Sequence, residues 1–125
     1  MRALIVDNNE FARARLKEAL EHIGFEVVGE ADDGLDAIEG YRNLKPDIVT
    51  MCVTMPEMDG IETTKKIKEE DPDATILMVT ALASSDILMS EALEAGVLDY
   101  LGKPFTVDEL NKAIEGIKPR KPKRL

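Results

Sequence analysis

Short, unbroken apolar runs alternate along the chain with longer segments in which apolar residues recur every three or four positions. An apolar run of four or five residues is typical of a strand that is buried on both faces of a parallel sheet. The pattern therefore predicts strands at residues 3–6, 25–29, 47–51, 75–79 (finishing at Thr80) and 98–101.

Helices are predicted after each of these strands. The clearest helical spacing is that of Val107, Leu110, Ile114 and Ile117. Each predicted helix is preceded by a polar segment that can cap its first turn, at 7–9, 32–34, 59–62, 84–86 and 106–109. The segments at 59–62 and 106–109 resemble capping boxes. Strict alternation with short connections implies an α/β fold: a doubly wound, five-stranded parallel sheet with helices on both faces and right-handed crossovers.

Composition and charge narrow the class of protein. The 125 residues are enough for one domain, and 44% of them are hydrophobic and 33% charged, as in soluble globular proteins. The formal charge is −9, although residues 118–124 are strongly basic. An acidic body argues against nucleic acid or an anionic membrane as a direct partner. We expect one folded domain over residues 1–118 and a basic, flexible tail or linker start over 119–125.

Localisation is expected to be cytoplasmic. The one cysteine, Cys52, cannot form an internal disulfide, which fits a reducing compartment. The apolar run that follows Met1-Arg2 is too short for a signal peptide. No stretch approaches the roughly 20 apolar residues that a membrane span requires.

Five polar side chains follow the predicted strands. Asp7 and Asn8 follow the first strand, Cys52 the third, Thr80 ends the fourth and Lys103 follows the fifth. In an open parallel sheet the carboxyl ends of all strands lie at one edge, where ligands bind. Each residue alone is ordinary, as a cap, a strand end or a solvated charge, but their joint placement favours a functional site.

Several motifs at these positions resemble those of the receiver domains of two-component response regulators, the chemotaxis-type single-domain form in particular. The resemblance runs from Leu4 to Ile117. Its motifs are Ile-Val-Asp-Asn-Asn at 5–9, Ala-Asp-Asp-Gly at 31–34, Pro-Asp-Ile-Val-Thr-Met at 46–51, Met-Pro-Glu-Met-Asp-Gly at 55–60, Val-Thr-Ala at 79–81 and Lys-Pro-Phe at 103–105. It implies the flavodoxin-like strand order 2-1-3-4-5.

The resemblance also implies roles for single residues. The position of the phosphoacceptor aspartate is that of Cys52, and the acidic pair corresponds to Asp7 and Asn8. Thr54 has the position of the backbone carbonyl that binds the metal, and Thr80 that of the hydroxyl that senses the phosphoryl group. The switch aromatic corresponds to Tyr100, and the phosphate-pairing lysine corresponds to Lys103. For Tyr100, a half-buried strand aromatic is the plainer interpretation.

The resemblance further implies Mg²⁺ as cofactor and two kinds of protein partner. A histidine kinase supplies the phosphoryl group, and a downstream effector meets the face built from helix 4, strand 5 and helix 5. The chain is expected to be a monomer or a weak homodimer, and not an enzyme.

Two departures from the family pattern change the expected chemistry. Asn8 replaces a carboxylate that binds the metal directly, and Cys52 replaces the nucleophile. Mg²⁺ prefers hard, anionic oxygen ligands, so its affinity for Asp7, Asn8, Cys52 and the Thr54 carbonyl should be low. An aspartyl phosphate cannot form at a cysteine, and no base is evident to activate the thiol. The sequence therefore predicts a receiver that cannot be phosphorylated.

The reason for the cysteine stays open among three interpretations. The chain can be a natural pseudo-receiver that signals by protein contact, or an engineered variant with one addressable thiol, which leaves Asn8 unexplained. The third interpretation is a cysteine-based redox sensor, because Lys103 nearby would lower the pKa of the thiol.

Two other classes of protein fit the sequence less well. A flavodoxin-like cofactor protein needs a phosphate-binding loop after the first strand, where this chain has the acidic segment 7–10. A cysteine phosphatase needs an arginine in the loop just after the thiol, and residues 53–57 contain none. His22 is expected on the surface of the first helix, and Asp32, Asp33 and Asp59 are interpreted as turn and cap residues.

Overall fold

Five parallel strands form one sheet in the order β2-β1-β3-β4-β5, which confirms the predicted fold class and strand order. The computed structural model describes residues 1–117, so the predicted tail at 119–125 lies outside the described residues. The elements in chain order are β1 (Arg2–Val6), α1 (Glu10–His22), β2 (Glu26–Ala31), α2 (Gly34–Leu44), β3 (Ile48–Met51), α3 (Gly60–Glu70), β4 (Ile76–Thr80), α4 (Asp86–Ala95), β5 (Asp99–Gly102) and α5 (Val107–Ile117).

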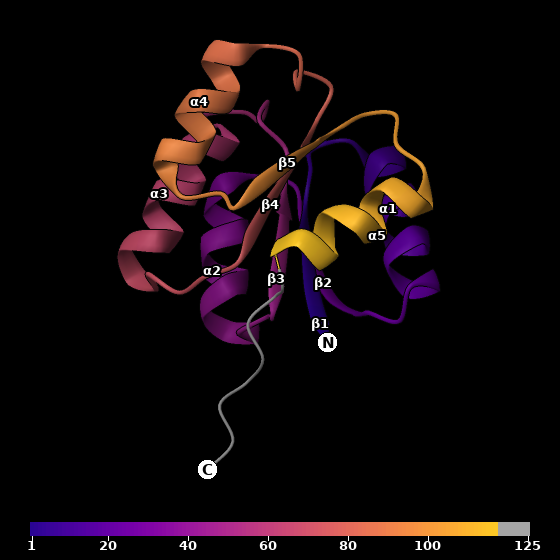
Figure 1. Cartoon of the computed structure of the whole chain (residues 1–125). Coiled ribbons are helices and arrows are strands. Elements are labelled where there is room, and N and C mark those ends of the chain that lie inside the picture. Colours follow the sequence, from indigo (N-terminus) through magenta and orange to yellow (C-terminus); the bar gives the residue numbers. More distant parts are fainter. Residues whose placement is uncertain (118–125) are drawn as a thin grey trace.

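The sheet is covered on both faces, as Figure 1 shows: α1 and α5 lie on one side, and α2, α3 and α4 lie on the other. Successive side chains of each strand point to opposite faces of the sheet. Ile5, Ile48 and Leu77 pack with Leu20 of α1 and Leu110 of α5. The opposite core contains Leu4, Val49, Met51, Ile76, Met78, Ile61, Ile67 and Met89. The central strands are therefore almost wholly buried, which explains their unbroken apolar runs.

The second strand differs most from its predicted range of 25–29. It begins at Glu26, because the Phe25 amide still donates to the carbonyl of Leu20 at the end of α1, at 2.9 Å. It continues to Ala31, because Ala31 pairs with Val6 of β1. An irregularity in the register near Leu4 inserts one extra residue into β2. The other strands begin and end within one residue of the predictions.

Side-chain caps begin the helices where the sequence predicts them. Asn9, Asp33, Asp59 and Ser85 each accept a hydrogen bond from a backbone N–H of the first turn. At the start of α5 the capping box is complete: the Thr106 amide donates to Glu109 at 2.9 Å, and the Glu109 amide donates to the Thr106 hydroxyl at 3.1 Å. Asp33 and Asp59 are thus caps, as expected.

The start of α3 lies against the end of β3. The Gly60 amide donates to the carbonyl of Val53 at 2.7 Å. A Cβ atom at Gly60 would lie 1.7 Å from the carbonyl oxygen of Cys52, so only glycine allows this approach. The loop that follows β3 is therefore held by direct contact with the first turn of α3. No helix within residues 1–117 is long and apolar enough to cross a membrane.

Candidate functional site at the carboxyl edge of the sheet

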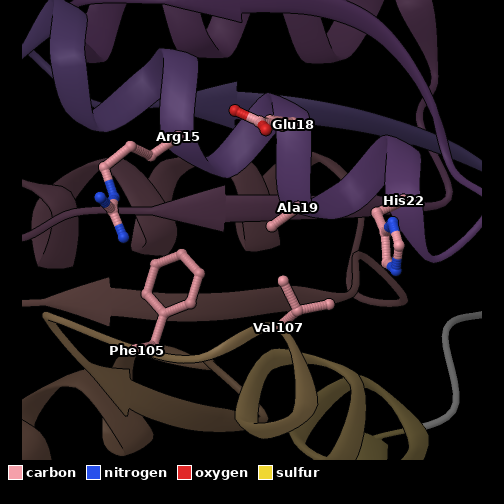
Figure 2. Close-up of a pocket in the computed structure, with 6 residues that line it drawn as sticks. All are labelled: Arg15, Glu18, Ala19, His22, Phe105 and Val107. Carbon is pink, nitrogen blue, oxygen red and sulfur yellow. The ribbon is translucent and has the colours of Figure 1, made fainter.

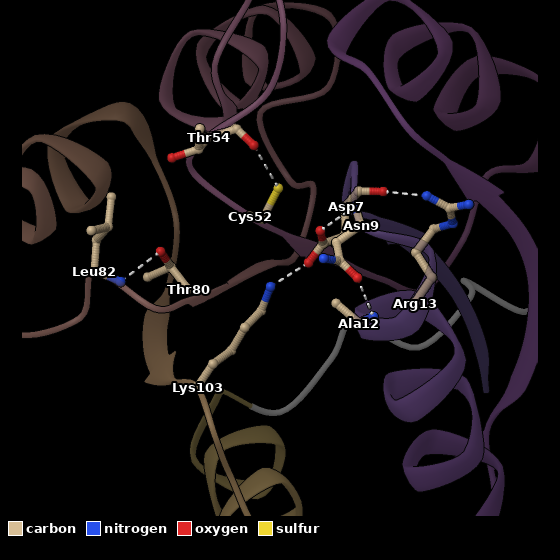
Figure 3. Close-up of polar contacts among 9 residues, drawn as sticks. All are labelled: Asp7, Asn9, Ala12, Arg13, Cys52, Thr54, Thr80, Leu82 and Lys103. Atoms are coloured by element: carbon tan, nitrogen blue, oxygen red, sulfur yellow. Dashed lines mark hydrogen bonds and ion pairs between the residues drawn. The ribbon is translucent and has the colours of Figure 1, made fainter.

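Strand register brings the predicted site residues to one edge of the sheet. Val6 of β1 pairs with Met51 of β3, and the Cys52 amide donates to the Val6 carbonyl at 3.1 Å, so the residues that follow, Asp7 and Cys52, emerge side by side. Thr80 of β4 pairs with Gly102 of β5, immediately before Lys103. Figure 3 shows that these side chains converge from four separate segments.

Asp7 is the most heavily bonded residue of the site. It is only 3% exposed. Its Oδ2 forms an ion pair with the Lys103 ammonium, and its Oδ1 accepts a hydrogen bond from the Asn9 amide at 2.9 Å. Its backbone carbonyl accepts a hydrogen bond from Arg13 Nη1 at 2.7 Å. Both carboxylate oxygens are therefore already bonded within the protein.

Arg13 was not singled out by the sequence. Its Nε also contacts Glu30 Oε1 on β2, at 3.1 Å, so one guanidinium joins α1, the end of β1 and β2. Figure 3 shows its contact with Asp7. The only signal in the sequence is its place four residues after the cap Asn9, on the first turn of α1. That position alone does not distinguish a partly buried, bridging arginine from a solvated one.

Cys52 is buried, with 5% of its surface exposed, and its Sγ donates to the Thr54 carbonyl at 3.5 Å. Burial, followed by the negative charge of Asp7, raises the pKa of the Cys52 thiol to about 11. Lys103 acts in the opposite direction, but its effect is smaller. The thiol is therefore neutral at physiological pH. Lys103 lowers the pKa of the thiol, as expected, but burial and the charge of Asp7 outweigh it, so the pKa is raised overall.

Alkylation of Cys52 by iodoacetamide should therefore be slow at pH 8 and should become about tenfold faster with each pH unit up to about pH 10, because only the thiolate reacts. A free thiol in a short peptide reaches its maximum rate about two units lower. Mass spectrometry of samples quenched over time measures both rates. A rate for Cys52 that levels off near pH 8 would contradict the raised pKa.

Thr80 and Tyr100 lie on the strands next to this cluster. The Thr80 hydroxyl is buried and accepts a hydrogen bond from the Leu82 amide at 3.0 Å, which fixes the start of the loop between β4 and α4. Tyr100, on the edge strand β5, is 38% exposed and pairs with Met78 in the register. The switch roles of both residues remain predictions.

The donor set does not fit Mg²⁺. Asn8 and Thr54 are exposed, and the Thr54 carbonyl accepts the hydrogen bond from the Cys52 thiol. Asp7 is the single carboxylate of the set, and it is paired with an ammonium. Mg²⁺ requires hard anionic oxygen in a strict octahedron, whereas a neutral thiol is a poor ligand for it.

Within residues 1–117, one group of three possible ligand side chains is close enough together to share a cation. It consists of Asp32, Asp33 and Asp36, which follow β2. Their carboxylates lie within 4.8 Å of one another, and the charge of Asp33 raises the pKa of Asp36. Asp33 Oδ1 also caps α2 by accepting the Asp36 amide. Helix capping therefore accounts for Asp33, as the sequence indicates, while Asp32 and Asp36 are exposed.

A separate hollow lies between α1 and α5. It has a volume of about 300 Å³, and Figure 2 shows Phe105 and Val107 pointing toward α1 across it. Its other lining residues are Arg15, Glu18, Ala19 and His22. His22 is exposed at the end of α1, as expected, and no buried polar side chain enters the hollow. The hollow therefore shows no feature of a catalytic site.

Comparison with known proteins identifies the family. The model of the response regulator receiver domain matches residues 3–115. The chain is 46% identical to the chemotaxis protein CheY of Thermotoga maritima over 115 residues, which cover 89% of this chain and 95% of that protein. It is 45% identical to CheY of Bacillus subtilis over 113 residues, or 90% of this chain and 93% of that protein.

Solved structures agree with this relationship. CheY in the CheX–CheY–BeF3–Mg complex of Borrelia burgdorferi superposes with a TM-score of 0.91 at 30% identity, over 96% of this chain and 90% of that one. The response regulator domain of Thermotoga maritima CheB superposes with a TM-score of 0.88 at 34% identity, over 98% of both chains. The chain belongs to the response regulator receiver family, as a CheY-like receiver domain of two-component signalling.

Proposed function

We propose that this receiver relays its signal through protein contacts and does not accept a phosphoryl group. The observation that carries the proposal is that Cys52, which the family resemblance places at the acceptor position, is a buried thiol with a raised pKa. A carboxylate attacks phosphorus as an anion, whereas this thiol is neutral and hydrogen-bonded to the Thr54 carbonyl. The proposed role is that of a signalling module without an enzymatic activity of its own.

The state of Asp7 supports the same proposal. A divalent cation normally neutralises the charge of a transferring phosphoryl group. Here the carboxylate of Asp7 is paired with Lys103, and Asn8 offers an amide oxygen in place of a second carboxylate. Mg²⁺ would therefore bind weakly or not at all, and the positive charge of Lys103 is not free to meet a phosphoryl group.

The proposed contact surface is the face of α4, β5 and α5. Large apolar side chains are exposed on or beside these elements, namely Ile87, Leu93, Leu98, Tyr100 and Val107. Exposed apolar groups next to polar ones are typical of protein-binding surfaces. We propose a histidine kinase and a downstream effector as partners, in the cytoplasm. The acidic charge of the chain disfavours direct binding to nucleic acid, and we propose a monomer or weak homodimer.

The redox-sensor alternative is weaker on the same observations. A sensing cysteine reacts as a thiolate that solvent can reach. Cys52 is 5% exposed, and its pKa is raised to about 11. Both properties slow oxidation. Whether the substitutions arose naturally or by design does not change this chemistry.

Incubation with acetyl phosphate and Mg²⁺ tests the proposal. The protein should keep its intact mass, because neither a carboxylate nor a thiolate stands at position 52. Electrospray mass spectrometry at neutral pH, without an acid step that hydrolyses acyl phosphates, measures the result. A phosphorylatable receiver treated in parallel shows that the reagent is active. A stoichiometric phosphoryl adduct on this chain would overturn the proposal.

A further inference from the structure

The ion pair between Lys103 and Asp7 joins two loops at the carboxyl edge of the sheet, one after β5 and one after β1 (Figure 3). We infer that the Lys103 ammonium takes the place of a divalent cation at this edge, so that the site is complete without Mg²⁺. This inference rests on the proposed function. It adds that an internal ion pair, in place of a bound metal ion, holds the two loops of the site together.

The first argument is charge. Among the predicted ligand residues, Asp7 contributes the one carboxylate, and Cys52 is a buried side chain whose Sγ is hydrogen-bonded to the Thr54 carbonyl. One ammonium balances one carboxylate, so little negative charge remains to attract a doubly charged ion. A cation that entered would either displace the ammonium or lie beside it, and like charges in a partly buried site repel strongly.

The second argument is the use of donor atoms. Lys103 and the Asn9 amide bond the two oxygens of Asp7, and the Thr54 carbonyl accepts the Cys52 thiol hydrogen bond. A metal ion would have to break these bonds and then be coordinated mainly by neutral groups. The existing contacts already satisfy the buried polar atoms, which otherwise would need a cation or water.

The third argument is position. The Lys103 side chain is 25% exposed and that of Asp7 is 5% exposed, so solvent screens this pair much less than a surface pair. Arg13 holds the carbonyl of the same aspartate from the opposite side. Asp7 is thus held by a side chain of α1, through its carbonyl, and by a side chain of the loop after β5, through its carboxylate. A cation on the predicted ligands would instead join the loops after β1 and β3, but it would neutralise the same carboxylate.

Thermal unfolding with and without Mg²⁺ tests the inference. The wild-type Tm should be the same within about 1 °C in millimolar MgCl₂ and in EDTA, because the site has no vacancy for the ion. Lys103→Met should lower the Tm by several degrees, because it leaves a buried carboxylate unpaired. Mg²⁺ should raise the Tm of this variant more than that of the wild type.

Lys112→Met is the matched control. Lys112 also pairs with an aspartate, Asp108, at 3.1 Å, but both side chains are 74% exposed. Its loss should leave the Tm nearly unchanged, since an exposed pair contributes little. Lys103→Arg keeps the charge and should recover part of the loss.

The inference would be overturned if Mg²⁺ raised the wild-type Tm as much as it raises that of Lys103→Met. It would also be overturned if Lys103→Met had the same Tm as the wild type in EDTA. A third contradicting result is Mg²⁺ binding to the wild type at millimolar concentration in calorimetry. The calorimetric result does not depend on whether any variant folds. Mg²⁺ binding without a phosphoryl adduct would refute this inference and leave the proposed function standing. The proposed function fails only if the adduct forms.

Discussion

Gly60→Ala is expected to destabilise the protein by about 3 kcal/mol or more, because the new methyl group would overlap backbone rather than a movable side chain. The added Cβ would lie 1.7 Å from the carbonyl oxygen of Cys52 and 2.8 Å from its carbonyl carbon. Relief requires that the first turn of α3 move away from the end of β3, which would also weaken the 2.7 Å hydrogen bond from Gly60 to Val53. Urea unfolding followed by circular dichroism measures the loss.

Gly116→Ala provides the matched control. Gly116 lies in α5, and a Cβ atom there would meet nothing within 4 Å. Alanine should therefore raise the free energy of unfolding by up to about 1 kcal/mol, because glycine is the poorer helix former. Equal effects of the two substitutions, in sign and size, would show that the loop after β3 does not depend on this close contact.

Asn8→Asp combined with Cys52→Asp is expected to restore both metal binding and phosphorylation. Three carboxylates would then meet at one edge, and Lys103 can balance only one of them. The double variant should melt below the parent protein in EDTA. Saturating Mg²⁺ should raise its stability by roughly 2–3 kcal/mol, the value for a ligand at about a hundred times its Kd. Acetyl phosphate should then add one phosphoryl group.

The single variants separate the two effects. Asn8→Asp alone has no nucleophile and should stay unphosphorylated, although its affinity for Mg²⁺ rises. Cys52→Asp alone should be phosphorylated slowly, because the metal site still lacks one carboxylate. If the double variant melts above the parent protein in EDTA, then repulsion among the carboxylates does not govern this edge, and the electrostatic account of the site is wrong.

The fold follows from the sequence because its signals are local. Buried central strands require continuous apolar runs, and Asp33, Asp59 and the pair Thr106 and Glu109 cap helices that are visible in the pattern of residues. The position of β2 was harder to predict, since it is an edge strand with few fully buried residues. The bounds of β2 depend on its pairing with β1, and this pairing cannot be predicted from the local sequence pattern.

The sequence predicts which side chains meet at this edge of the sheet, but it does not predict all of the bonds that they form. Strand ends locate Asp7, Cys52, Thr80 and Lys103 at one edge, as the structure has them. The partner of Lys103 depends on the balance of charges there, and in the structure that partner is Asp7. The bridge formed by Arg13 and the direction of the Cys52 pKa shift depend on burial and on side-chain direction, which appear only in three dimensions.

The ion pair between Asp7 and Lys103 also has a consequence for biosynthesis. The two residues are separated by 96 positions in the chain. A ribosome adds residues from the N-terminus at about 5–20 per second, so Asp7 emerges several seconds before its lysine is made. Until then the first β-strand and α-helix cannot bury that carboxylate with its ammonium partner. Nascent chains that end before residue 103 should therefore stay in a looser state, and addition of Lys103 and the α5 helix that follows it should be the step that closes the domain.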